Sequence, residues 1–147
     1  MFFLFSSCKK IRVCYYALAM IGQVHLFDKT SNQTIYKGIG TIDTLKNDGC
    51  RVQFQNDTHH FTWNIYESGL VIRSESEIVV NLTLRPQRKT KGHIETTFGI
   101  IDCECETTFY QKNLNHVEIQ YILIQGNEKQ KFHFILSINK EGNYAIH

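Results

Sequence analysis

A long run of alternating residues in the C-terminal half of the chain limits the possible folds more than any other feature. After Gly99, one set of alternate positions is apolar and the other is acidic. The apolar set is Ile101, Cys103, Cys105 and Phe109, and the acidic set is Asp102, Glu104 and Glu106. Successive side chains of a strand point to opposite faces, so this pattern predicts a half-buried strand whose acidic face meets water. Residues 117–123 and 132–138 alternate in the same way, which predicts two further antiparallel strands.

The chain between Met20 and Gly92 repeats this signal in shorter segments. We expect strands at residues 21–27, 34–42, 50–55, 59–66, 70–73 and 78–84. Polar or glycine-containing turns separate them, and the Asp48-Gly49 pair is typical of a hairpin. No segment after Met20 has a helical period, and a meandering sheet of eight to ten strands removes its exposed edges by closing. We therefore predict an all-β domain, a single antiparallel closed β-barrel whose interior is filled by side chains or holds one small ligand.

The charge of the chain is unevenly distributed. The formal net charge is +2, but residues 1–19 contain Lys9, Lys10 and Arg12 and no acid. Residues 20–147 hold 13 basic and 14 acidic residues. A nearly neutral domain does not attract a polyanion, so the composition disfavours a nucleic-acid partner.

Residues 1–19 allow three interpretations: a secretory signal, a part of the fold, or residues that precede the natural start codon. In a signal peptide the positive charges precede the apolar run, whereas here the apolar residues 2–5 come before them. No run of about 18 apolar residues is present, so we expect no membrane helix. We predict a barrel domain at residues 20–147 and a non-native or disordered extension at residues 1–19. The sequence leaves open whether translation starts at Met1 or Met20.

The cysteines indicate a reducing compartment. Two of the five lie within the first nineteen residues, which leaves Cys50, Cys103 and Cys105 in the domain. An odd number argues against a disulfide framework, and Cys103 and Cys105 are too far apart along an extended chain to bond each other comfortably. We therefore expect a cytoplasmic location. Because no second cysteine pair completes a zinc site, Cys103 and Cys105 are expected to be small buried residues.

The titratable residues do not form a recognisable catalytic or metal site. His59 and His60 are neighbours on a strand, so they point to opposite faces and do not chelate one ion together. Four other histidines are scattered over separate strands: they are His25, His93, His116 and His133. No nucleophile motif accompanies them, although a triad assembled only in the fold stays open. We expect no enzymatic activity, no metal and no cofactor.

The chain resembles a known family through a spaced pattern of motifs. Gly69-Leu-Val-Ile-Arg73 is followed by alternating residues, a Lys/Thr-rich loop, and Thr97-Phe98-Gly99 before the acid-alternating strand. This order is similar to that of the bacterial YwiB-like proteins, the domain of unknown function DUF1934, from about residue 50 to residue 138. The resemblance implies a calycin-like, lipocalin-type β-barrel with no established activity, so no catalytic residue is carried over. Pro86 and the two-cysteine strand depart from the family pattern.

The first functional hypothesis is a small, partly apolar or amphipathic ligand held inside the barrel without catalysis. The residues expected to contact it are Phe54, Trp63, Arg73, Tyr121 and Phe134. The pattern does not decide which way Arg73 points. If it points inward, it needs an anionic partner such as a ligand carboxylate or phosphate, because a buried unpaired charge is too costly. If it points outward, it pairs at the surface, which is the commoner arrangement.

The alternative hypothesis is an interaction module with a filled barrel. Its contact surface would be a basic loop that meets protein or RNA through charge. The basic residues of this loop are Arg85, Arg88, Lys89 and Lys91. The sequence leaves a monomer and a homodimer equally open.

Overall fold

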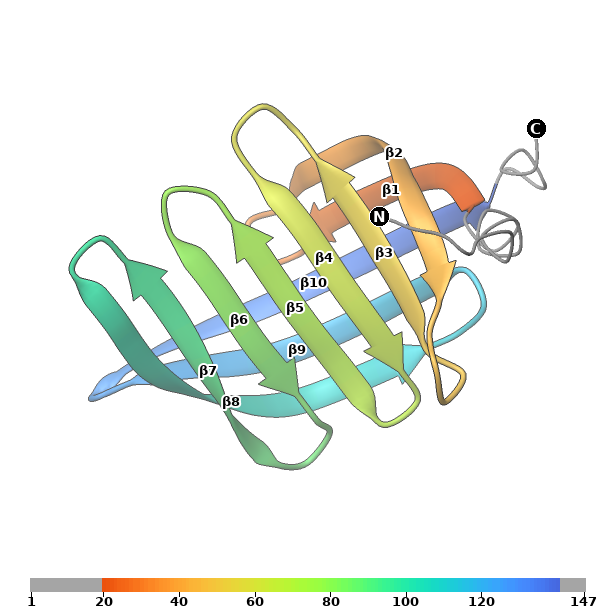
Figure 1. Cartoon of the computed structure of the whole chain (residues 1–147). Helices are drawn as coiled ribbons and strands as arrows, with labels where there is room; N and C mark the ends of the chain where they lie inside the picture. Colours follow the sequence, from red (N-terminus) through yellow and green to blue (C-terminus); the bar gives the residue numbers. More distant parts are fainter. Residues whose placement is uncertain (1–19, 141–147) are drawn as a thin grey trace, which may run out of the picture.

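The computed structural model describes residues 20–140, so the predicted extension at residues 1–19 lies outside the described residues, as do residues 141–147. The described part consists of ten strands joined by short turns. They are β1 (Met20–Asp28), β2 (Gln33–Thr44), β3 (Cys50–Gln55), β4 (His60–Tyr66), β5 (Gly69–Glu75), β6 (Val79–Leu84), β7 (Lys89–Thr96), β8 (Gly99–Lys112), β9 (His116–Gln125) and β10 (Glu128–Lys140). Each strand pairs antiparallel with the next, and β10 pairs with β1 (Figure 1). This confirms the predicted all-β class and the closed antiparallel barrel.

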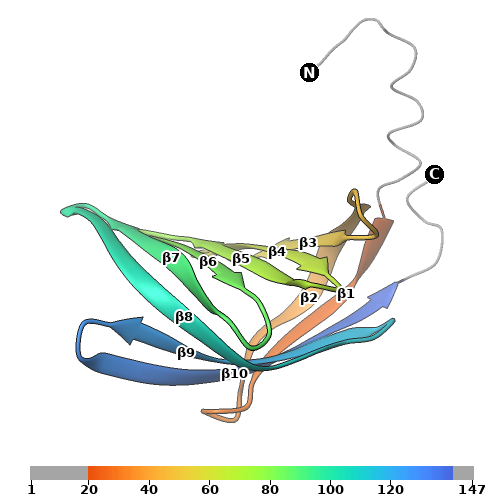
Figure 2. The same cartoon turned by 90° about the horizontal axis from the view of Figure 1, so that it is seen from below.

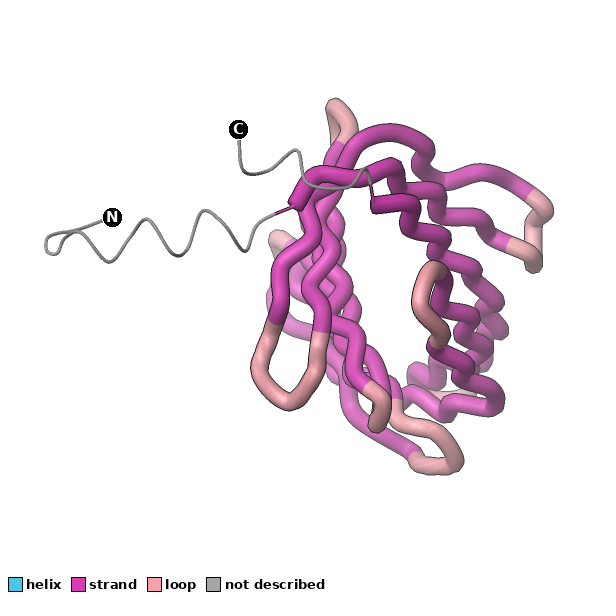
Figure 3. Tube along the Cα trace, turned by 90° about the vertical axis from the view of Figure 1, so that its right-hand side faces the viewer, coloured by secondary structure: helices cyan, strands magenta, loops and turns pink. Residues whose placement is uncertain are grey.

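The barrel is an oval ring when viewed along its length (Figure 3). Strands β3 to β7 lie on one side of the ring and β9 and β10 lie on the other. Strand β8 runs between the two sides at one edge, and β1 and β2 run between them at the opposite edge (Figure 2). The six shorter strands predicted from the sequence agree with the observed bounds to within two residues. The observed order is a simple meander: strands that are adjacent in the sheet are also adjacent in sequence, except for β1 and β10, which close the barrel.

The core lies between the two sides of the ring and consists of the inward-facing alternate residues. Trp63, Leu84, Ile119 and Leu136 come from β4, β6, β9 and β10, and each is at most 2% exposed. Burying a large apolar side chain of this kind contributes about 1.5–3 kcal/mol to folding. The alternation predicted from the sequence therefore becomes a continuous apolar interior.

Strand β8 departs from the predicted alternation in its second half. Cys103 and Cys105 are buried as expected, but the register between β8 and β9 shifts between Thr107 and Phe109. A bulge of this kind inserts one extra residue and turns the following side chains to the other face. Phe109 is consequently 38% exposed, so its predicted inward position is wrong, and Tyr110 packs against the core instead. Ile101 was also expected inside but is 45% exposed near the end of the β7–β8 hairpin.

The bulge brings the Tyr110 side chain to the turn between β4 and β5. Its hydroxyl donates a hydrogen bond to the Tyr66 carbonyl oxygen and lies 3.1 Å from the Gly69 carbonyl oxygen. Gly69 has a φ of 156°, and a Cβ there would lie 2.3 Å from the Leu84 carbonyl oxygen. Only glycine fits this turn without strain. Tyr110 therefore fastens the β4–β5 turn to β8, a strand far from it in sequence.

Candidate functional site

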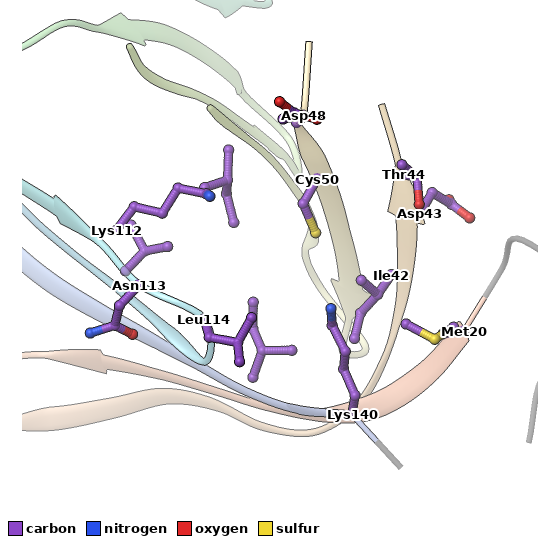
Figure 4. Close-up of a pocket in the computed structure, with 14 residues that line it drawn as sticks. Met20, Ile42, Asp43, Thr44, Asp48, Cys50, Lys112, Asn113, Leu114 and Lys140 are labelled. Atoms are coloured by element: carbon purple, nitrogen blue, oxygen red, sulfur yellow. The ribbon is translucent and has the colours of Figure 1, made fainter. Parts of the chain in front are cut away.

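A pocket with a volume of about 310 Å³ lies at the end of the barrel where β1, β3 and β9 begin and where β2, β4, β8 and β10 end (Figure 4). Its floor is formed by inward-facing residues of the core: Ile42, Ile65, Val117 and Ile138. These side chains are between 2% and 7% exposed. Because each of these side chains faces inward near the end of its strand, the apolar interior of the barrel reaches the bottom of the pocket.

Two lysine side chains stand over this apolar floor. Lys112 ends β8 and Lys140 ends β10, and Figure 4 shows their amine groups turned toward the middle of the pocket. The Lys112 side chain is 23% exposed, and its Nζ lies 3.6 Å from Oε1 of Glu67, whose side chain is 80% exposed. An ion pair with such an exposed carboxylate is weak. The Lys112 side chain is thus largely shielded from water, and the carboxylate that it pairs with is exposed.

Cys50 begins β3, and Figure 4 shows its thiol turned into the same pocket as the two lysine side chains. Burial raises the pKa of its thiol, while the positive charges of Lys140 and Lys112 oppose this shift. The net direction is upward, so the thiol stays protonated at neutral pH and is a poor nucleophile. The lysine charges act on the same thiol from two strands, and Figure 4 shows both amine groups turned into the pocket.

Two aspartates also line the pocket. Figure 4 shows the Asp43 carboxylate turned away from the middle of the pocket, and Asp48 lies in the β2–β3 turn at its edge. Asp43 acts on the Cys50 thiol more weakly than either lysine does. The inner surface of the pocket is therefore apolar below and positively charged at its side. Such a surface suits a small molecule with an anionic head and an apolar body.

The aromatic residues predicted to contact a ligand lie in the core and do not line this pocket. Phe54, Trp63 and Tyr121 are 3%, 2% and 5% exposed. Phe54 stacks on Phe61 with ring centroids 5.0 Å apart, and Phe134 lies 6.3 Å from the Tyr121 ring. These side chains pack within the core away from the end pocket, and their role in ligand binding stays a prediction.

Arg73 lies on the outer face of β5. Its neighbour Ile72 points into the core, and the Arg73 Nη2 atom lies 3.3 Å from the Glu75 Oε2 atom two residues further along the strand. The Arg73 side chain is 40% exposed. This is the surface-paired orientation, so Arg73 does not reach the interior of the barrel.

The predicted basic loop is only partly a loop. Arg85 and Arg88 lie in the β6–β7 turn and are exposed, but Lys89 and Lys91 belong to β7. The expectation of a loop over residues 85–91 is wrong for its second half, because β7 pairs with the long strand β8 from Lys89 onward.

Pairing with β8 also places an acid opposite each of these two lysines. Lys89 is directly opposite Glu106, and Lys91 is directly opposite Glu104. Opposite charges facing each other across strands attract, so the lysine charges are partly balanced on the same surface. Two residues further along, the Nδ1 atom of His93 lies 3.0 Å from Oδ1 of Asp102.

Sequence reasoning did not select Cys50, Lys112 and Lys140. They are far apart along the chain and belong to no motif. The only available signal is that each lies where a predicted strand begins or ends. Within residues 20–140, no group of three or more His, Cys, Asp or Glu side chains is arranged to hold a metal ion. The same part of the chain contains no helix with the length and apolarity of a membrane span.

Comparison with solved structures finds a similar fold in the crystal structure of the YwiB protein from Bacillus subtilis. The TM-score is 0.58, and the match covers 84% of this chain and 92% of the other. The two sequences are 10% identical, so the likeness shows a YwiB-like fold and nothing about activity. No protein-family model matches the chain, and a search of curated proteins finds no match.

Proposed function

We propose that this protein is a non-catalytic cytoplasmic β-barrel that binds a small amphipathic anion in the pocket at the end of the barrel. The ligand class is a carboxylate or phosphate head with a short apolar body. The observation that carries the proposal is the position of Lys112 and Lys140, whose amine groups turn into one pocket above a floor of buried aliphatic side chains. A volume of about 310 Å³ is at the lower end of the range for small-molecule sites.

The energetics of the site favour a ligand of this kind. The Lys112 side chain is 23% exposed and pairs only weakly with the exposed Glu67 carboxylate, so it is available to an anionic ligand in the pocket. An anionic head between the two lysines provides charge-assisted hydrogen bonds, which are about twice as strong as neutral ones. An apolar body against the floor gains roughly 25 cal/mol for each Å² of apolar surface that it removes from water.

Three further observations support the details of the proposal. The upward shift of the Cys50 pKa supports a binding role over covalent catalysis. The free thiols of Cys50, Cys103 and Cys105 support a reducing compartment. The YwiB-like fold, together with the motif order from Gly69 to Gly99, supports a distant relationship to the DUF1934 family and its calycin-like barrel.

The alternative function, an interaction module that uses Arg85, Arg88, Lys89 and Lys91, receives less support. Two of its four cations face Glu104 and Glu106 across the sheet, which weakens the field that a polyanion would meet. Binding of a small anion in the end pocket does not depend on an unbalanced basic surface on the outside of the barrel.

The proposal is tested with octanoate as the probe and octanol as its neutral counterpart. We expect octanoate, but not octanol, to shift the amide NMR signals around Cys50, Lys112 and Lys140 in a saturable way. Lys112→Gln and Lys140→Gln are expected to weaken binding about tenfold each, the magnitude of a lost charge-assisted contact. Lys131→Gln, on the exposed outer face of β10, is the matched control and leaves binding unchanged.

Two results would overturn the proposal. The first combines two measurements. Octanoate produces no saturable shifts at the pocket, and native mass spectrometry of the protein purified from its own host without denaturation shows the mass of the protein with no bound molecule. The other is equal binding of octanoate by the wild type and the double variant of Lys112 and Lys140. Specific salt-dependent binding of RNA that is lost on Arg88→Glu would instead support the interaction module.

A further inference from the structure

A row of polar residues crosses four strands on the outer face of the barrel, near the end that carries the pocket. His116 on β9 is directly opposite Ser137 on β10, Ser137 is directly opposite His25 on β1, and His25 is directly opposite Lys37 on β2. Residues directly opposite each other point to the same face of a sheet. The inward neighbours of His25 and Ser137 are buried core residues, so the whole row faces outward.

The surface at this row is hollowed. A cavity of about 360 Å³ is lined by all four residues of the row. The amide side chains of Gln23, Asn115 and Asn139 also line it. No carboxylate is among the described residues that line the cavity, and Lys37 carries its positive charge. Besides the apolar residues Val24 and Ile138, the lining thus consists of residues whose side chains donate hydrogen bonds or both donate and accept them.

The two histidines of the row differ from others in the described part of the chain. His60, His93 and His133 each lie within 3.5 Å of a carboxylate oxygen. His25 instead has its Nε2 atom 3.1 Å from the Thr34 hydroxyl oxygen. Among residues 20–140, neither His25, His116 nor Lys37 forms an ion pair with an acid.

The acid nearest along β9 is already engaged. Glu118 lies two residues beyond His116 on the same face, and its Oε2 atom is 2.6 Å from Nε2 of His133. The Glu118 and His133 side chains are about equally shielded, at 22% and 23% exposed. The row is therefore a local positive, donor-rich surface on a protein that is otherwise nearly balanced in charge.

We propose that this hollow is a binding site for a phosphate monoester carried on a small hydroxylated molecule, separate from the end pocket. Neighbouring strands lie about 4.8 Å apart, so a phosphoryl group seated over Ser137 has an imidazole on each side. The long side chain of Lys37 reaches the group from the next strand and supplies the positive charge that phosphate oxygens require. The three amides donate to and accept from the hydroxyls of the carrier.

The two sites lie on opposite faces of one barrel wall. Ile138 lines both, and the β8–β9 turn contributes Leu114 to the inner pocket and Asn115 to the outer hollow. The outer site does not depend on the anionic amphiphile proposed for the inner one. Failure of octanoate binding leaves the outer site unaffected, and the reverse also holds.

The test is a titration of the whole protein with inorganic phosphate and with glycerol 3-phosphate, followed by two-dimensional amide NMR. We expect saturable shifts at His25, Lys37, His116 and Ser137, with tighter binding of the ester than of phosphate. Lys37→Gln is expected to weaken ester binding at least tenfold, and Ser137→Ala severalfold. Lys131→Gln, an exposed lysine on the outer face of β10, serves as the control and leaves binding unchanged.

Lys37 is exposed, so its replacement does not endanger folding, and the titration of that variant stays interpretable. The proposal is overturned if neither probe shifts these four signals in a saturable way, or if Lys37→Gln and the wild type bind the ester equally. Equal affinity for phosphate, sulfate and the ester would also overturn it, because the carrier would then contribute nothing.

Discussion

Replacing Tyr110 by phenylalanine removes one hydroxyl group and nothing else from the contact between β8 and the β4–β5 turn. In the native protein this hydroxyl donates to the Tyr66 carbonyl and lies 3.1 Å from the Gly69 carbonyl. The two carbonyls belong to a turn that is separated from Tyr110 by more than forty residues of chain. The variant therefore tests a long-range contact rather than a local one.

The expected cost follows from the groups that the substitution leaves unpaired. A hydrogen bond contributes about 0.5–1.5 kcal/mol net, and a partner left partly buried without a hydrogen bond costs about 1–3 kcal/mol. The ring of Tyr110 is partly buried and its apolar contacts persist in phenylalanine. We therefore expect Tyr110→Phe to lower the free energy of unfolding by about 1–3 kcal/mol.

Urea denaturation followed by Trp63 fluorescence measures this change, because Trp63 is the single tryptophan and is buried in the core. The midpoint should fall while the m-value stays the same. Tyr36→Phe is the matched control: the Tyr36 hydroxyl donates to the Ile39 carbonyl 2.6 Å away, an exposed contact only three residues along the chain. We expect it to cost less than half as much. A Tyr110→Phe protein within about 0.5 kcal/mol of the wild type would refute the reasoning.

Three more outcomes are expected. Burial raises the pKa of both Tyr110 and Tyr121 above the ordinary value of 10.0, so the folded state keeps these protons to a higher pH than the unfolded state does. The free energy of unfolding should therefore fall as the pH rises above about 10. A free energy of unfolding that stays constant up to about pH 12 would contradict this. Gly69→Ala should lower the free energy of unfolding by about 1–3 kcal/mol in the same urea assay, because the added Cβ would meet the Leu84 carbonyl oxygen. An unchanged midpoint would show that the β4–β5 turn shifts without cost to make room for it. In native protein a thiol reagent should modify Cys50 before the two buried cysteines of β8 but more slowly than a free thiol, and simultaneous labelling of all three would contradict the burial described.

The strands were predictable because their signal is local. In each segment apolar residues recur at every second position, and polar turns such as the one at Asp48-Gly49 mark where the segments end. The inner face of most strands follows from the same period, as Trp63 and Ile119 show. The basic segment was misjudged because the pairing of Lys89 with Glu106 extends β7 beyond its own apolar pattern.

The amino-acid sequence by itself therefore determined the all-β class, the antiparallel order and the residues that fill the core, since each depends on neighbours a few positions apart. Only the tertiary structure decided the register of closure, which joins β1 to β10 from the two ends of the barrel domain. That register brings His25 beside Ser137, and the bulge after Thr107 decides that Tyr110, not Phe109, faces inward. Both sites depend on these long-range contacts, because their residues share no local pattern and meet only when the sheet closes.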